Sequence, residues 1–295
     1  MLKIEKNIIM GIIITLSGSL LYVLMGALSK SIGKDLLINQ LMFLQSFSGL
    51  LCASYLMRIK KYNWRQLLAN QKPIHIMRSA MSLLSVYAFM YGLRYMSIFN
   101  ALIILNSAPL IIPLLRKIFF KKNIHYFIFP PVLIAFAGLV LILKPDRHII
   151  EAPMLIVFVS MMCMSLSLLI LEKSQDINPN LSIFYYFFYS SLVTGMLLIY
   201  QHQFFSVKLQ VIPAGILLGV LFFLVQLSVI YAAQYISSQL ISVLFYAEII
   251  IALFASILLE GMQINYQLLL GTALIILGGW TVILFEAKSR AHSIF

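Results

Sequence analysis

The amino-acid sequence predicts an all-α membrane protein of ten transmembrane helices, arranged as two inverted repeats of five helices each. Three observations support this fold class. The first is composition, because 62% of the 295 residues are hydrophobic and 10% are charged, whereas soluble domains average about 45–50% apolar and about 25% charged residues. The second is a series of long apolar runs. The third is an internal repeat at a fixed offset of 140 residues.

The apolar runs are continuous, which excludes the alternating pattern of a membrane β-barrel. A spanning helix needs about 20 mostly apolar residues. Ten runs come close to this requirement and are joined by short connections, so no separate extramembrane domain is expected. In chain order they are Ile8–Ser29, Leu36–Met57, Ile74–Arg94, Phe99–Leu115, Ile124–Leu143, Ala152–Leu171, Leu181–Tyr200, Val211–Gln234, Ser238–Leu259 and Tyr266–Phe285.

In the first half, the first span follows the charged segment Leu2–Lys6. The run is longer than a signal-peptide core and has no evident cleavage site, so we expect it to be retained. Arg78 and Arg94 stand near the two ends of the third span and are expected to be interface anchors. In the fourth span, Pro109 and Pro113 free backbone carbonyls and predict either a gating bend or a static kink.

In the second half, the ninth span has Ile249 where the fourth has Pro109, so the bend is not expected to recur there. The tenth span contains Gly271, Gly278 and Gly279. Small residues let membrane helices approach closely, and helix packing explains these glycines fully.

Loop charges predict the orientation of the chain, because cytoplasmic loops carry an excess of Lys and Arg. With the N-terminus inside, fifteen Lys and Arg residues fall on the cytoplasmic side and six on the other side. Both termini are therefore predicted to be cytoplasmic. The asymmetry comes mainly from the first half, since the second half carries few charges.

The repeat divides the chain into residues 1–146 and 147–295. At the offset of 140, Pro73 matches Pro213, and Tyr95 matches Tyr235. Each half has five spans, an odd number, so the two halves are predicted to have opposite orientations in the membrane. Inverted repeats are a recurring build of secondary transporters, with the substrate site near the midplane at the repeat interface.

Glu248 is the candidate site residue that the sequence marks most clearly, because it is the one acidic residue near the centre of a long apolar run. A carboxylate at this depth in the membrane has a high free-energy cost, so it is predicted by default to belong to a functional site. It is predicted to bind a cationic group of a substrate or the coupling proton. The alternative is a structural carboxylate held by a neighbouring hydroxyl or Arg.

Further polar or amphipathic side chains lie within the spans. Tyrosine rings can hold a cation or a planar ring, and amides can orient a polar ligand; the alternative is hydrogen bonding between helices. Together with Glu248, the predicted substrate pathway comprises Tyr246, Tyr231, Gln226, Tyr91, Asn106 and Gln45.

Several other functions are excluded by the sequence. The net charge of +12 comes from short basic clusters between apolar runs, so nucleic-acid binding is not expected. The two cysteines and five histidines lack metal-ligand spacing, and no phosphate-binding loop or catalytic motif is present. We therefore predict no cofactor, no metal site and no enzymatic activity; an enzyme or a scaffold protein is the less favoured reading.

The segment Arg78–Leu115 resembles the first-repeat core of the EamA-type transporters in the drug/metabolite superfamily, with an Arg opening the third helix and a Tyr-Gly pair near its end. Leu227–Gly278 resembles the second-repeat core, including Glu260-Gly261. The resemblance covers Ile8 to Phe285. It implies a ten-helix, two-repeat carrier in the inner membrane of a bacterium.

Within that superfamily, the segments Ala27–Phe47, His75–Ser79 and Tyr246–Ile250 look like the S-adenosylmethionine uptake carriers. Relatives often have an Arg in the second helix, where this chain has Gln45.

The sequence thus predicts an alternating-access carrier for a small polar organic metabolite, with S-adenosylmethionine uptake as the favoured case. The alternative is efflux of amino acids or cationic compounds. Its expected partners are a small-molecule substrate and the lipid bilayer, and the protein is expected to be a monomer or a homodimer.

Overall fold

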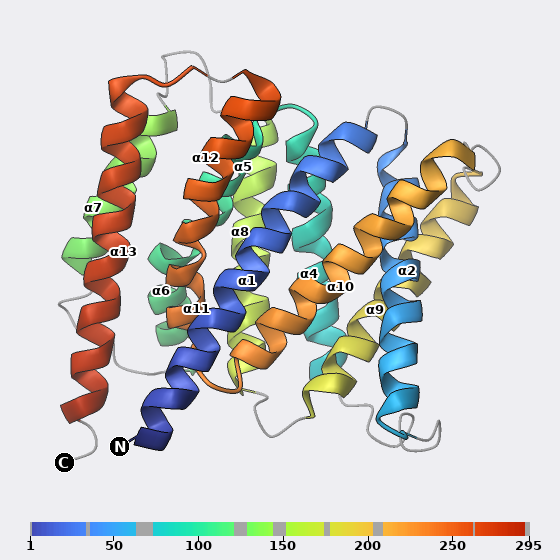
Figure 1. Ribbon diagram of the computed structural model, residues 1–295, viewed down its shortest axis with the longest axis horizontal. Coiled ribbons are helices and arrows are strands. Elements are labelled where there is room, and N and C mark those ends of the chain that lie inside the picture. The colour runs from blue at the N-terminus through green and yellow to red at the C-terminus, as the bar shows by residue number, and fades with distance from the viewer. Residues whose placement is uncertain are drawn as a thin grey trace.

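The computed structural model describes residues 2–33, 36–62, 73–120, 129–143, 152–173, 178–202, 209–261 and 263–292. This part of the chain is helical (Figure 1). Its α-helices are α1 (Leu2–Ile32), α2 (Ile38–Ile59), α4 (Pro73–Leu93), α5 (Ile98–Leu105), α6 (Ala108–Phe120), α7 (Phe129–Leu143), α8 (Ala152–Lys173), α9 (Pro179–Tyr200), α10 (Ile212–Ala232), α11 (Ser238–Leu244), α12 (Tyr246–Glu260) and α13 (Tyr266–His292), and a 3₁₀ turn, η3 (Leu209–Val211), precedes α10.

Within the described residues, seven helical segments are long and apolar enough to cross a membrane. They are α1, α2, α4, α8, α9, α10 and the combined α11–α12 segment. The predicted fifth and tenth spans correspond to shorter apolar stretches, Phe129–Ile142 and Tyr266–Thr281. The chain is therefore a multi-pass membrane protein, and the predicted count of ten spans remains a prediction.

The predicted fourth span is two helices, α5 and α6, which meet at Asn106 and Ser107. Ser97 caps the start of α5, where its hydroxyl accepts a hydrogen bond from the Asn100 N–H at 3.1 Å. Pro109 lies in the first turn of α6, where a missing N–H breaks no intrahelical bond. Pro109 thus marks the start of a helix, and Pro113 follows one turn later.

A milder interruption occurs at Phe245, between α11 and α12. The Glu248 N–H donates to the Phe245 carbonyl at 2.9 Å, a tight turn of the 3₁₀ kind. The expectation that the second half lacks a break was therefore wrong. This break occurs without a proline. It places Glu248 in the first turn of α12, where the helix dipole favours a carboxylate.

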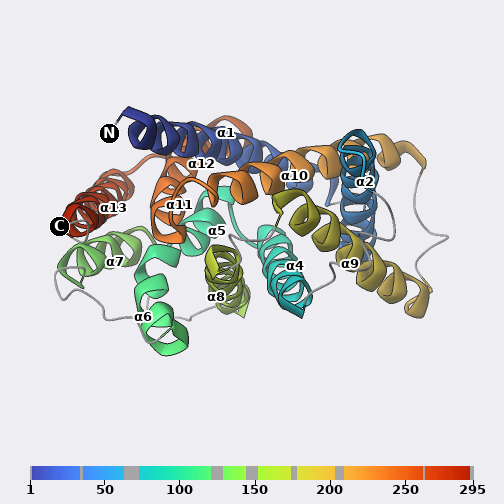
Figure 2. The same cartoon turned by 90° about the horizontal axis from the view of Figure 1, so that it is seen from below.

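The helix contacts follow the repeat. Helix α1 packs along α10, and α8 packs along α4; the offset of 140 residues relates these two pairs to each other. Helix α2 packs against α9, and α7 against α13, so each of these pairs joins equivalent helices of the two halves (Figure 2). The beginning of α1 and the end of α13 lie on the same side of the molecule (Figure 1).

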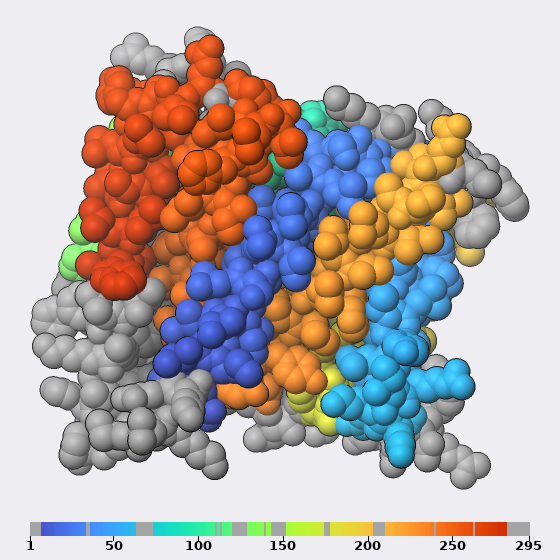
Figure 3. Space-filling view, viewed as in Figure 1, coloured from blue at the N-terminus to red at the C-terminus, as the bar shows by residue number. Residues whose placement is uncertain are grey.

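The outer surface is apolar and the interior contains polar groups. Ile118, Leu258 and Trp280 are 68%, 82% and 61% exposed, whereas Gln45, Asn106 and Thr194 are fully buried. On the face shown in Figure 3, α1 lies between α12 and α10. Apolar side chains outside and hydrogen-bonding groups inside suit a protein that is surrounded by lipid.

Helices α7 and α13 approach each other through glycines. A Cβ atom added to Gly271 would lie 2.7 Å from the Gly138 carbonyl oxygen, and one added to Gly138 would lie 2.5 Å from the Gly271 carbonyl oxygen. These contacts are with backbone, so a side chain cannot rotate out of the way. The expected packing role of Gly271 is confirmed by this contact.

We expect Gly271→Ala to destabilise the protein by about 1–3 kcal/mol, because α7 and α13 must separate to admit the methyl group. Gly26 is the matched control, since a Cβ there would lie 3.9 Å from its nearest neighbour, Ile98. Gly26→Ala should be neutral or stabilising by about 0.5–1 kcal/mol, through the better helix propensity of alanine. Thermal unfolding in detergent measures both. Equal melting temperatures for the two variants would contradict the close approach.

Candidate functional site

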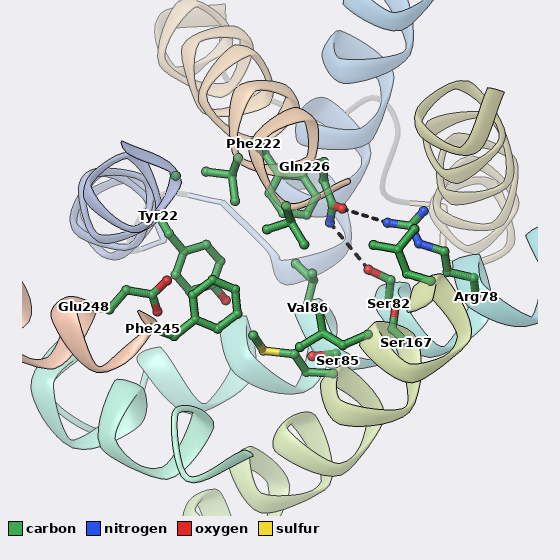
Figure 4. A pocket seen from close by; sticks show the side chains of 16 residues that line it. Tyr22, Arg78, Ser82, Ser85, Val86, Ser167, Phe222, Gln226, Phe245 and Glu248 are labelled. Carbon is green, nitrogen blue, oxygen red and sulfur yellow. Dashed lines mark hydrogen bonds between the residues drawn. The ribbon is translucent and has the colours of Figure 1, made fainter. Parts of the chain in front are cut away.

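A cavity of about 60 Å³ lies between the two halves of the molecule. It is lined by residues of α1, α4, α8 and α10, together with Phe245 and Glu248 at the break between α11 and α12 (Figure 4). Helices α1 and α8 are equivalent in the repeat, and so are α4 and α10. The cavity therefore occupies the repeat interface, where two-repeat transporters place their sites.

One end of the cavity carries the carboxylate of Glu248. This side chain is 2% exposed, and its Oε2 accepts a hydrogen bond from Asn106 Nδ2 at 2.9 Å. Asn106 is the C-cap of α5, and Glu248 lies in the first turn of α12. Two interrupted helices, one from each half, thus meet through this bond. The rings of Tyr22 and Phe245 lie beside the carboxylate (Figure 4).

The other end carries the guanidinium of Arg78, which is 3% exposed. Its Nη1 donates to the Ser182 carbonyl at 3.3 Å, and its Nη2 donates to Gln226 Oε1 at 3.2 Å. Gln226 Nε2 in turn donates to Ser82 Oγ at 3.4 Å. The guanidinium also stands 5.9 Å from the centre of the Tyr186 ring.

The expectation that Arg78 is an interface anchor was therefore wrong. Its side chain is held between α9 and α10, instead of reaching along the surface to water. A helical spacing in the sequence could have revealed this, because Arg78, Ser82 and Ser85 recur at intervals of four and three residues on one face of α4. All three line the cavity. Tyr22, on α1, is another lining residue that the sequence analysis did not single out.

Apart from Asn106, which contacts Glu248, four of the predicted substrate-pathway residues lie outside the cavity lining. Tyr91 is 38% exposed, with its ring 5.0 Å from that of Tyr95. Tyr231 donates to Asn180 Oδ1 at 2.8 Å. Tyr246 is buried at the contact between α12 and Gly279 of α13.

The fourth is Gln45, which is fully buried on α2. Neither its side-chain oxygen nor its nitrogen has a hydrogen-bond partner within the described structure. Of the predicted set, Glu248 and Gln226 line the cavity and Asn106 supports Glu248.

Two ion pairs in the described residues join the halves at opposite ends of the molecule, and we call them the end pairs. At one end, Lys30 Nζ on α1 lies 2.6 Å from Glu260 Oε1 on α12. Glu260 Oε1 also accepts from the Ile98 N–H at 3.4 Å, which places it at the start of α5. Helix α12 stops directly after Glu260, at Gly261 in the left-handed conformation, a common helix C-terminus.

At the other end, Arg116 Nη2 on α6 lies 2.7 Å from Glu172 Oε2 on α8. Glu172 also accepts from the N–H of Ser238 at 3.3 Å and from its hydroxyl, at the start of α11. Ile98 and Ser238 are equivalent at the offset of 140 residues. The carboxylate of Glu260 therefore lies at the start of α5 in the first half, and the carboxylate of Glu172 lies at the start of α11, the equivalent helix of the second half.

An apolar exterior, two halves with matching helix contacts, and a charged cavity between them define a multi-pass membrane protein with an internal polar site. In the described part of the chain, no group of His, Cys, Asp and Glu side chains could hold a metal ion.

The chain belongs to the EamA-like transporter family, whose model matches residues 9–144 and again residues 152–284. The family consists of transporters, and the two matches confirm that the chain contains two repeats. A solved structure, described as "Crystal structure of protein", is similar with a TM-score of 0.73 and 15% sequence identity, covering 93% of this chain and 97% of that chain. At this identity the likeness shows the fold alone. No curated protein sequence matches the chain.

Proposed function

We propose that the protein is a secondary transporter that moves a small polar organic metabolite by alternating access. The observation that carries the proposal is the cavity between the two repeats, with the buried side chains of Glu248 at one end and Arg78 at the other. Burying two ionisable side chains within a membrane protein costs free energy, and such residues usually bind a ligand or line a transport pathway. The sequence has no phosphate-binding loop, so an ion gradient or the exchange of solutes would supply the energy.

The end pairs support alternating access. The helices that carry them are related by the repeat, since α1 is equivalent to α8 and α12 to α6, and each pair joins the two halves. Opening one face would separate Lys30 from Glu260, and opening the other would separate Arg116 from Glu172. With both pairs formed, the cavity of about 60 Å³ is smaller than the roughly 300–1,000 Å³ of typical ligand pockets. A substrate would therefore enter only when the helices around the cavity move apart.

S-adenosylmethionine uptake is the favoured activity, and it rests on the sequence resemblance. The alternative is efflux of amino acids or cationic compounds, which the carboxylate of Glu248 would suit equally well. Aromatic side chains from α1, α10 and the α11–α12 break (Tyr22, Phe222 and Phe245) line the cavity and could hold an apolar or planar part of either kind of substrate.

An uptake screen in proteoliposomes tests the proposed function. Purified protein would be reconstituted and supplied with radiolabelled S-adenosylmethionine, amino acids and nucleotides, with and without a proton or sodium gradient. We expect saturable, gradient-dependent or exchange-dependent uptake of at least one solute. Empty liposomes provide the background. Uptake at the background level for all solutes, under every gradient, would reject the carrier function.

We also propose that the protein lies in a bacterial inner membrane with both termini in the cytoplasm, and that its repeats divide near residues 146 and 147. The excess of Lys and Arg in alternate loops supports this orientation. A small-molecule substrate and the bilayer are the proposed partners, and the protein would act as a monomer or a homodimer.

Reporter fusions should therefore be active on the cytoplasmic side when joined to Phe295 or inserted after Lys60 or Lys61. A fusion inserted after Gly33 should report the opposite side, because α1 separates it from the N-terminus. A reporter at Phe295 on the outer side would contradict the predicted even number of crossings.

A further inference from the structure

The cavity of the proposed carrier holds two opposite charges, neither of which is paired with an opposite charge among the described residues. Among the described residues that line it, Arg78 is the basic one and Glu248 the acidic one. Within the described structure, neither takes part in an ion pair. The two groups stand at opposite ends of the cavity, with aromatic and apolar side chains between them (Figure 4).

The hydrogen bonds of Arg78 leave part of its guanidinium unused. Its acceptors are the Ser182 carbonyl and the Gln226 amide oxygen, both neutral, and Nε has no partner within the described residues. A buried guanidinium needs a counter-charge, because neutral acceptors compensate only part of the loss of hydration. A planar carboxylate matches the two parallel donors of a guanidinium.

Glu248 is the complement at the other end. Its Oε2 accepts from the amide of Asn106 at 2.9 Å, which orients the carboxylate without neutralising it. An ammonium or sulfonium group would supply the missing positive charge, and the neighbouring ring of Tyr22 would add a cation–π surface.

From this arrangement we propose that the cavity binds a zwitterion, with its carboxylate on Arg78 and its cationic group on Glu248. This inference rests on the proposed transport function. It narrows the substrate class to α-amino acids and their derivatives with an apolar or aromatic body, which the rings of Tyr22, Phe222 and Phe245 would contact. A zwitterion brings one charge of each sign and so neutralises both ends at once.

Matched series of compounds test the proposal on the purified full-length protein. One series is phenylalanine, phenethylamine without the carboxylate, and 3-phenylpropanoate without the amine. A second is leucine with its amine and acid analogues, and a third compares S-adenosylmethionine with its decarboxylated form. Ligand-induced shifts in melting temperature over a range of concentrations give the affinities. In at least one series the zwitterion should bind roughly tenfold or more tightly than each analogue.

Variants then assign each charge. Arg78→Gln should bind the zwitterion and the amine analogue equally, and Glu248→Gln should bind the zwitterion and the acid analogue equally. Arg94→Gln, on a residue outside the cavity lining that donates to the Leu36 carbonyl at 2.7 Å, is the control and should keep the wild-type preference. If Arg78→Gln does not fold, Arg78→Lys keeps the charge but loses the planar fork, and should weaken zwitterion binding selectively.

The proposal is overturned if an analogue with one charge binds the wild-type protein as well as its zwitterion, or if no compound of any series binds. It is also overturned if Arg78→Gln keeps the full preference. These outcomes differ from failure of the transport function. Saturable uptake of a solute that is not a zwitterion would reject the zwitterion site but support the carrier function. Binding of a zwitterion without uptake of any solute would support the zwitterion site but reject the carrier function.

Discussion

Glu248→Gln is expected to weaken the binding of a cationic or zwitterionic substrate by more than about tenfold, while the melting temperature changes little. Glutamine has nearly the same volume, and its amide oxygen can accept the 2.9 Å hydrogen bond from Asn106. What is lost is the charge, and a desolvated charge pair is worth about 2–5 kcal/mol when one partner is removed. Affinity and thermal unfolding should be measured on the same purified sample.

Asn106→Ala is the matched control for this substitution. It removes the hydrogen bond but leaves the carboxylate, so its effect on affinity should be smaller than that of Glu248→Gln. If Glu248 carries a coupling proton, Glu248→Gln should retain solute exchange but lose accumulation driven by pH. Wild-type affinity, uptake and pH dependence in Glu248→Gln would contradict every functional role of this residue.

Locking either end pair should reduce transport to background, which is the largest effect expected for any change outside the cavity. Lys30→Cys with Glu260→Cys, or Arg116→Cys with Glu172→Cys, would be joined by a short thiol-reactive linker that contains a cleavable disulfide. The native Cys52 and Cys163 would first be replaced by Ala. Because partly exposed ion pairs contribute only about 0–1 kcal/mol, the unlinked variants should fold.

Cleavage of the linker by a reductant should restore transport in both double variants. The single variants Lys30→Cys and Arg116→Cys, treated in the same way, control for the chemical modification itself. An alternating-access carrier must open each face in turn, so a lock at one end is sufficient to stop it. If a fully linked protein still transports its substrate at the unlinked rate, the end pairs are not the moving contacts.

The sequence predicted the long helices well, because bilayer thickness sets a length that apolar runs display directly. It predicted a bend in the fourth span from Pro109 and Pro113, but it did not predict that a helix ends at Asn106, and it did not predict the interruption at Phe245. The segment Ile98–Leu115 is apolar almost throughout, so its average hydropathy resembles that of one continuous span. At the interruption, Asn106 is the C-cap of α5, and its side chain donates a hydrogen bond to Glu248 across the repeat interface.

The candidate site was only partly predictable for a similar reason. Glu248 stands out because a carboxylate in an apolar run is rare. Arg78 does not stand out, since a basic residue near the start of a span is usually an anchor. Its burial depends on Ser182 and Gln226, which follow more than 100 residues later in the chain. Tyr91 shows the opposite case, since it was expected on the substrate pathway but is 38% exposed and lies outside the cavity lining.

The end pairs divide their charges between the halves, since Lys30 and Arg116 belong to the first repeat and Glu172 and Glu260 to the second. Helices α1 and α8 are equivalent, and so are α6 and α12. A pair of first repeats from two copies of the chain would therefore set Lys30 against Arg116, and a pair of second repeats would set Glu172 against Glu260. Like charges would meet at both ends in either case. The halves are thus complementary, and when produced as separate polypeptides, each half should assemble with the other half and not with itself.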